Sequence, residues 1–153
     1  MVWRLITHHT NPDEALIWYQ EHNLIALGWG NIGNLQNQQV NNQHDIAALY
    51  NQVYSQGNAG ECGRCLWDFW NVMAIGDLVI LGIGKGRRAC VVEVVGNYFF
   101  NNNYPPNVNA QMLDGYYHRR AVMPTKHEAN DIWKQNALPA PGANIRHALC
   151  QLI

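Results

Sequence analysis

Short apolar runs alternate with amphipathic stretches along the chain, and this pattern predicts a domain that mixes strands and helices. Runs rich in Val, Ile and Leu predict strands at residues 2–6, 24–27, 78–83 and 89–95. Apolar residues at helical spacing predict helices that begin at Pro12 and that cover residues 45–54, 66–74 and 126–136. The first of these has an Asn at the cap position, Pro next and two acidic residues in its first turn, which is typical of a helix start.

The two strongest strand signals are joined by Gly84–Arg88, so residues 78–95 are predicted to form a hairpin. Further strands are expected at residues 116–123 and 145–153. Helices interspersed with strands that are joined as hairpins indicate an α+β fold, a small curved and mostly antiparallel β-barrel with flanking helices. No repeat or linker interrupts residues 1–153, which predicts a single domain.

Composition adds a weakly ionised surface to this picture. Charged residues make up only 14% of the chain, while 19 Asn and 10 Gln supply polarity without charge. Amide-rich stretches at residues 31–43 and 101–111 are predicted as loops. No apolar run approaches the ~18 residues of a membrane span, and the first ten residues do not resemble a signal peptide, so a cytoplasmic protein is expected.

The net charge of −1 hides an asymmetry along the chain. Residues 1–77 contain two basic and seven acidic side chains, whereas residues 78–153 contain eight basic and four acidic ones. The total charge argues against a protein that coats nucleic acid by charge alone. A local basic face is still compatible with it, because binding responds to the field near the site.

The cysteines and the glycine-rich turn do not form known cofactor motifs. Cys62 and Cys65 make a CxxC pair, but a zinc ribbon needs a second pair, and Cys90 and Cys150 each stand alone. The glycines around Lys85 lack the spacing of a phosphate loop and precede a strand rather than a helix. We therefore expect no metal and no cofactor.

Catalytic residues are equally hard to find. The only serine, Ser55, has no recognisable base near it in the sequence, and no pair of carboxylates is placed for acid–base chemistry. An enzyme that processes nucleotides through His118 and Arg119 is one alternative, and a small-molecule or protein-interaction module is another. The charge asymmetry favours a nucleic-acid-binding domain over the interaction module, and the lack of a nucleophile, metal set or carboxylate pair argues against the enzyme.

Aromatic residues are the most informative set. Trp29 lies between two glycines at a predicted strand end, which favours an indole exposed at the mouth of a pocket. Trp67, Phe69 and Trp70 crowd one short segment, and Tyr98 follows the end of a strand. Such residues can stack on a nucleic-acid base, and each stacked pair contributes about 1–3 kcal/mol.

Four of these segments together resemble motifs of the PUA-like superfamily, and in particular its EVE-like branch, which is related to YTH domains. The resemblance as a whole covers residues 2 to about 124. Its motifs are Gly28-Trp29-Gly30; Trp67–Trp70 followed by Gly76-Asp77; Val92–Tyr98; and Tyr117–Val122. One departure is Met123-Pro124, where the family strand usually has a Trp. That Trp would form one aromatic wall of the pocket, and Tyr117 or Trp133 is expected to take its place here.

The resemblance implies a protein that is not an enzyme and that flips a modified base into an aromatic pocket. DNA is the expected ligand, in a restriction or defence system with a nuclease or AAA+ ATPase encoded nearby, and a YTH-type RNA reader is the alternative. The pocket is predicted from Trp29, Asn31, Trp67, Trp70, Tyr98, Tyr117 and His118. Asn31, Asn71 and Asn97 are the amides considered for reading the base edge.

Phosphate contacts are predicted from five basic residues on one face: Lys85, Arg87, Arg88, Arg119 and Arg120. Gly76-Asp77 is predicted to be structural instead. We expect Gly76 to allow a turn and Asp77 to accept hydrogen bonds from the backbone there.

Overall fold

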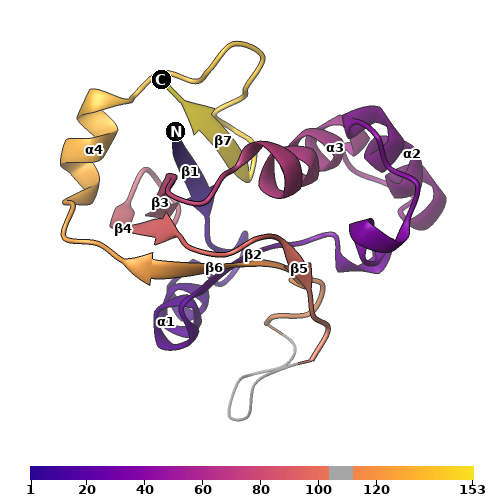
Figure 1. The fold of residues 1–153 in the computed structure, drawn as a ribbon, viewed down its shortest axis with the longest axis horizontal. Helices are drawn as coiled ribbons and strands as arrows, with labels where there is room; N and C mark the ends of the chain where they lie inside the picture. The colour runs from indigo at the N-terminus through magenta and orange to yellow at the C-terminus, as the bar shows by residue number, and fades with distance from the viewer. Residues whose placement is uncertain (104–111) are drawn as a thin grey trace.

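The strands form one strongly curled, mixed β-sheet in this computed structural model, which describes residues 1–103 and 112–153. Along the sheet the order is β2-β6-β4-β3-β1-β7, with the short β5 paired to β6. The curl produces a half-barrel with helices around it (Figure 1). The strands are β1 Val2–Ile6, β2 Leu24–Leu27, β3 Leu78–Gly82, β4 Arg88–Val94, β5 Phe99–Phe100, β6 His118–Pro124 and β7 Leu149–Leu152. The α+β class and the curved sheet are confirmed.

The N-terminal strand lies inside the sheet rather than at its edge. β1 pairs in parallel with β3, so that Val2 lies opposite Leu78, and antiparallel with β7, where Val2 lies opposite Leu152. The predicted hairpin is confirmed, because β3 and β4 pair antiparallel on either side of the glycine-rich turn. β1 is therefore held on both sides by strands that are remote in sequence.

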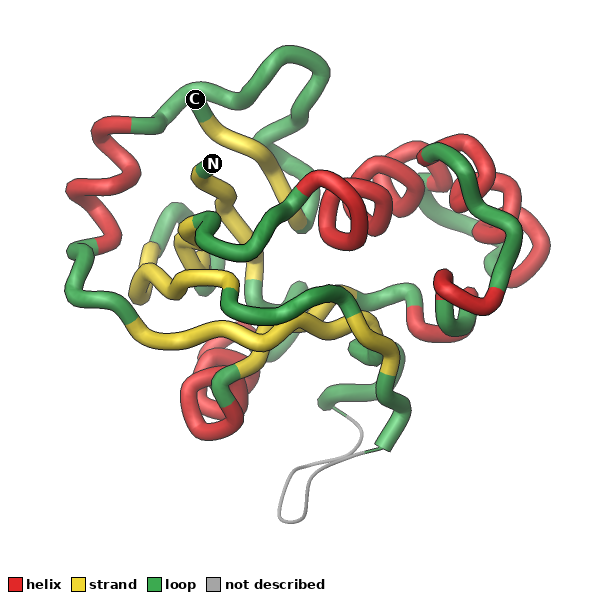
Figure 2. Tube along the Cα trace, in the orientation of Figure 1, coloured by secondary structure: helices red, strands yellow, loops and turns green. Residues whose placement is uncertain are grey.

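Four α-helices surround the half-barrel in the described residues: α1 Pro12–His22, α2 Gln43–Val53, α3 Ala59–Trp67 and α4 Ala129–Gln135. Figure 2 shows them outside the strands, with α2 and α3 at one end and α4 at the other. α1 begins at Pro12 as predicted and buries Ala15, Trp18 and Tyr19 against the core. No helix in this part of the chain is both long and apolar enough to cross a bilayer.

Two segments differ from the sequence prediction. The aromatic helix begins earlier than expected, at Ala59, and continues into a π-helical turn over Asp68–Val72. The amide-rich stretch 31–43 contains two short 3-10 turns, which bury Ile32 and Leu35. These two apolar side chains tie that stretch to the core. In the second predicted loop, residues 104–111 lie outside the described part of the chain.

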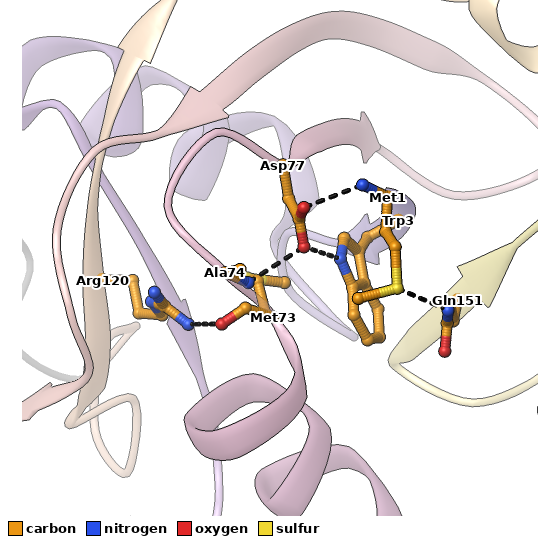
Figure 3. Close-up of polar contacts among 7 residues, drawn as sticks. All are labelled: Met1, Trp3, Met73, Ala74, Asp77, Arg120 and Gln151. Carbon is orange, nitrogen blue, oxygen red and sulfur yellow. Dashed lines mark hydrogen bonds and ion pairs between the residues drawn. The ribbon is translucent and has the colours of Figure 1, made fainter.

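The Gly76-Asp77 turn has the geometry that was predicted for it, and Figure 3 shows the contacts of Asp77. Gly76 has a φ of +96°, which favours glycine. The Asp77 carboxylate accepts hydrogen bonds from the Ala74 N–H and from Trp3 Nε1, both at 2.9 Å, and lies 2.8 Å from the Met1 amino nitrogen. Asp77 thus joins the start of β1 to the turn that precedes β3.

Candidate functional site

A cavity of about 670 Å³ opens where β1 and β2 end. Its walls come from the segments that follow these two strands, from the start of α3, and from residues 114–116 and 146–148. Five aromatic residues are among its described lining residues: His8, His9, Trp29, Tyr54 and Tyr116. The volume lies in the range of small-molecule sites, about 300–1,000 Å³. We call this the aromatic cavity.

The backbone of Trp29 is held in an unusual conformation. Its φ of +64° and ψ of +35° lie in the left-handed region, which bulky residues rarely adopt. Such strain is retained only where surrounding contacts enforce it, and it is concentrated at functional sites. Close packing requires glycine at the next position, residue 30. A Cβ on Gly30 would lie 2.3 Å from the Tyr117 ring and 2.6 Å from the Gly115 carbonyl oxygen.

A buried polar network supports the Trp29 backbone from behind. His118 Nε2 lies 3.2 Å from the Trp29 carbonyl oxygen, and its Nδ1 lies 2.7 Å from the Tyr98 hydroxyl oxygen. The neutral tautomer with its proton on Nε2 satisfies both contacts, since it donates to Trp29 and accepts from Tyr98. The Tyr98 oxygen in turn accepts a hydrogen bond from the Leu35 N–H at 3.3 Å. Burial lowers the pKa of His118 to about 4, which favours this neutral form.

Two histidines and a tyrosine stack along another part of the wall. The His8 ring lies 4.9 Å from the His9 ring and 4.5 Å from the Tyr116 ring, centroid to centroid. His8 is fixed at both nitrogens: Nε2 donates to the Met112 carbonyl at 2.7 Å, and Nδ1 accepts from the Asn11 N–H at 3.0 Å. Burial lowers the pKa of His8, so this ring is a flat, neutral surface.

Polar side chains among the described residues of the cavity wall include Asn31, Glu61, Asp114 and Arg146. The Glu61 carboxylate is held in place by one oxygen, which accepts a hydrogen bond from the Ala148 N–H at 3.1 Å. Its other oxygen, and the exposed Asn31 amide, have no hydrogen-bond partner among the described residues. A ligand donor can therefore bind to a carboxylate oxygen at this wall.

A second, smaller hollow of about 220 Å³ adjoins the aromatic cavity. Both are lined by Ile6 and Gly84. The smaller hollow, which we call the basic groove, is completed by Arg4, Gly82, Lys85, Gly86, Arg87, Arg88, Trp133 and Ile145. The β3–β4 turn thus places cations beside the aromatic cavity.

The structure brings only part of the predicted pocket together. Trp29 and Asn31 line the aromatic cavity as expected, while His118 lies behind Trp29. Trp67, Trp70, Tyr98 and Tyr117, which were also predicted for the pocket, are not among the described residues that line the aromatic cavity. Nor do Asn71 and Asn97 line it.

These four aromatic side chains have other partners. Trp67 and Trp70 meet edge to face at 6.0 Å and pack on the core, and Trp70 contacts the buried Tyr98. Tyr117 donates a hydrogen bond to Asp114 Oδ1 at 2.6 Å. The sequence prediction took crowding of aromatic residues as a sign of exposure, whereas Phe69 is fully buried and Trp67 and Trp70 are half-buried against the core.

The predicted phosphate face also needs correction, because Arg119 and Arg120 are each only 2% exposed. Arg120 donates to the carbonyl oxygens of Gly96, Phe69 and Met73, and Figure 3 shows the last of these contacts. Arg119 Nε donates to the Tyr116 carbonyl at 3.3 Å, and its guanidinium lies 5.1 Å from the Trp18 ring centre. Both arginines therefore bind backbone and core, not phosphates. Lys85 and Arg87 are exposed on the turn, and Arg88 is half-buried beside them.

Sequence reasoning missed Tyr54, Tyr116, Glu61 and the stacked His8-His9 pair as cavity residues. One signal was available for the histidines: they directly follow β1, and the Trp29 loop directly follows β2. Tyr116 was overlooked in favour of its neighbour Tyr117, because the resemblance pointed to the latter. Tyr54 and Glu61 come from helix ends, whose position over the cavity depends on tertiary packing.

The described cysteines and acidic residues form no group suited to a metal ion. Cys62 and Cys65 lie buried in α3, where burial raises the pKa of each thiol and opposes the thiolate form that binds metals. A protein-family model described as "Domain of unknown function (DUF8426)" matches residues 3–137, most of the chain. No curated protein matches the sequence.

Proposed function

Since this chain belongs to the DUF8426 family, whose description states no function, we propose a function from the cavity: the domain binds nucleic acid that carries a modified base, and it holds that base in the aromatic cavity. The observation that carries the proposal is Trp29, a tryptophan held in left-handed backbone geometry on the wall of a 670 Å³ aromatic cavity. Strain retained at such a wall is expected where the ring must face a ligand.

The chemistry of the cavity suits a flat, partly polar ligand. Indole, phenol and imidazole rings offer stacking surfaces, and each stacked base contributes about 1–3 kcal/mol. The free oxygen of Glu61 accepts from an N–H on the base edge, and the Asn31 amide both donates and accepts. Extrusion of a base from a duplex costs a few kcal/mol, which these contacts offset.

The basic groove favours a nucleic acid over an isolated small molecule. Lys85, Arg87 and Arg88 lie directly beside the cavity, where the phosphates that flank a flipped base would pass. The turn therefore supplies the phosphate contacts without Arg119 and Arg120. We propose DNA as the ligand, within a restriction or defence system that includes a nuclease or AAA+ ATPase; RNA is the second candidate.

A PUA-like fold of the EVE-like type is part of this proposal. It is supported by the half-barrel and by the position of Gly28-Trp29-Gly30, which follows β2 and borders the cavity. We propose binding rather than catalysis. Both ring nitrogens of His8 and of His118 are engaged by the protein, so neither ring is placed to exchange a proton with a ligand. His118 and Arg119, the alternative catalytic pair, are buried.

The test is binding of fluorescent oligonucleotides measured by anisotropy. The panel contains one central cytosine, 5-methylcytosine, 5-hydroxymethylcytosine, adenine or N6-methyladenine, each as single-stranded DNA, duplex DNA and RNA. We expect at least one modified oligonucleotide to bind at least tenfold more tightly than its unmodified counterpart. Trp29→Ala should abolish that preference, while Trp70→Ala, which alters a tryptophan outside the cavity, should retain it in folded protein. Equal binding of every modified and unmodified pair by the wild type would refute the proposal.

A further inference from the structure

The basic groove contains a tryptophan as well as cations. Its wall includes Trp133 from α4, and the Arg88 guanidinium carbon lies 4.1 Å from the centre of the Trp133 ring. Arg88 Nη1 also contacts Asn130 Oδ1 at 3.3 Å, which anchors the guanidinium to the same helix. The two side chains form a stacked pair, the Arg88–Trp133 platform. Both arginine planes and indole rings stack on nucleic-acid bases.

The remaining cationic side chains of the groove differ in how many hydrogen bonds and ion pairs they make within the protein. Arg4 is buried and donates to the carbonyl oxygens of Ile145 and His147, so it forms the floor. Lys85 is exposed at the tip of the turn and has no hydrogen bond or ion pair among the described residues. Arg87 Nη2 donates to the Ile83 carbonyl oxygen at 3.0 Å and lies 3.6 Å from Asp13 Oδ2, and an exposed ion pair of this kind contributes little. Lys85 and Arg87 are thus available to an anion.

We infer that the basic groove holds the nucleotide next to the base in the aromatic cavity. The connecting phosphate passes over Ile6 and Gly84, which both hollows share, and contacts Lys85 and Arg87. The neighbouring base stacks on the Arg88–Trp133 platform. This inference rests on the proposed function, because it requires the ligand to be a strand, and it assigns the protein a two-nucleotide footprint on that strand.

Stacking reads no base edge, so the neighbouring position should be tolerant of sequence. The aromatic cavity then determines selectivity, and the basic groove adds affinity. The two roles can be separated by experiment, because selectivity is a ratio of two affinities whereas the groove should change both affinities by the same factor.

The experiment uses single-stranded DNA hexamers with one central 5-methylcytosine, 5-hydroxymethylcytosine or N6-methyladenine, together with the free modified nucleosides. Trp133→Ala should weaken hexamer binding by about 5- to 100-fold. The ratio of modified to unmodified binding, and the affinity for the free nucleoside, should not change. An abasic nucleotide on one side of the modified base should cause the same loss in wild type, and no further loss in Trp133→Ala. Lys134→Ala alters an exposed lysine of α4 outside the groove and serves as the matched control.

A second variant avoids any disturbance of α4. Lys85 has a φ of +54°, a conformation that Asn tolerates, so Lys85→Asn removes the charge without backbone strain. The slope of log K against log salt, which is negative, should become less steep by about 1. If hexamer affinity is unchanged in both Trp133→Ala and Lys85→Asn while Trp29→Ala still abolishes selectivity, the groove inference is wrong and the proposed function stands. Loss of the modified-base preference in Trp133→Ala would also overturn the inference.

Discussion

The imidazole of His118 supports the carbonyl oxygen of Trp29 from inside the protein, with 3.2 Å between Nε2 and that oxygen. This contact links a buried strand residue to the residue with left-handed geometry on the cavity wall. The neutral tautomer that donates from Nε2 leaves Nδ1 as the acceptor for the Tyr98 hydroxyl. Protonation would keep the Nε2 donor but would put a second N–H on Nδ1, opposite the Tyr98 hydroxyl, and a charge at a buried position.

Acid should destabilise the protein through this residue. In the fold the pKa of His118 is lowered to about 4, mainly by burial, whereas in the unfolded chain it is about 6.5. The stabilising contribution of neutral His118 is complete above pH ~6.5 and is lost as the pH falls towards 4, a loss of about 3 kcal/mol. Urea denaturation at intervals between pH 7.5 and pH 4 measures it.

The matched variant for this measurement is His118→Gln, which retains polar atoms but does not titrate. Its free energy of unfolding should be lower at pH 7.5 and should fall less steeply with acid than that of the wild type. If the two pH profiles have the same slope between pH 6.5 and pH 4, His118 is not the responsible group.

Two substitutions at Trp29 separate the indole from the backbone strain. Both Trp29→Ala and Trp29→Gly remove the ring, and both should lose the preference for modified bases. Glycine adopts a φ of +64° without strain, whereas alanine does not. Trp29→Gly should therefore be more stable than Trp29→Ala by about 1 kcal/mol, measured by urea denaturation. A more stable alanine variant would show that residue 29 leaves the left-handed conformation once the ring is absent.

Gly30 and Gly28 flank this residue but should tolerate substitution differently. A Cβ at Gly30 would lie 2.6 Å from the Gly115 carbonyl oxygen, which belongs to the backbone, and 2.3 Å from the Tyr117 ring. At Gly28 the nearest atom is in the Tyr116 ring, at an ordinary 3.7 Å. We expect Gly30→Ala to lower the free energy of unfolding by about 1–3 kcal/mol and Gly28→Ala to change it by less than about 1 kcal/mol. Equal losses from the two would contradict the packing described at Gly30.

Asp77→Ala should lower stability and leave binding intact. It removes the acceptor for the buried Trp3 Nε1–H and for the Ala74 N–H, at a cost of about 1–3 kcal/mol. Burial alone would raise the pKa of Asp77, but the hydrogen bonds from Ala74, Met1 and Trp3 outweigh it and hold the pKa below its ordinary value. The contribution of Asp77 is thus present above pH ~4 and is lost as the pH falls below that value.

Thermal melts at pH 7 and pH 3 check this prediction. The difference between wild type and Asp77→Ala should be large at pH 7 and smaller at pH 3. Retained stability combined with loss of oligonucleotide binding would instead identify Asp77 as a ligand contact.

Local sequence pattern was sufficient for most of the elements. Pro12 after Asn11 marked the start of α1, and the apolar runs at 78–83 and 89–95 gave β3 and β4 almost to the residue. What the pattern did not contain was the order of the strands. The parallel pairing of β1 with β3 depends on contacts across 76 positions, from Val2 to Leu78, which no local periodicity records.

The candidate site was predictable only where an unusual backbone conformation requires glycine, because glycine is visible in the sequence. Gly28 and Gly30 flank Trp29 in this way, and Trp29 does border the cavity. Arg119 and Arg120 show the opposite case. Arginine side chains are ordinarily exposed, yet both guanidinium groups find carbonyl oxygens inside the protein. Whether a buried arginine has acceptors is a property of the assembled fold.

The placement of β1 has a consequence for the rate of folding. Val2 is fixed only when it meets both Leu78 and Leu152, so the entropy of closing two long loops is lost before these contacts stabilise the chain. Chains dominated by such non-local pairing fold in milliseconds to seconds rather than microseconds. In stopped-flow refolding followed by tryptophan fluorescence, we expect the buried Trp3 of β1 to reach its native signal in a slow, late phase.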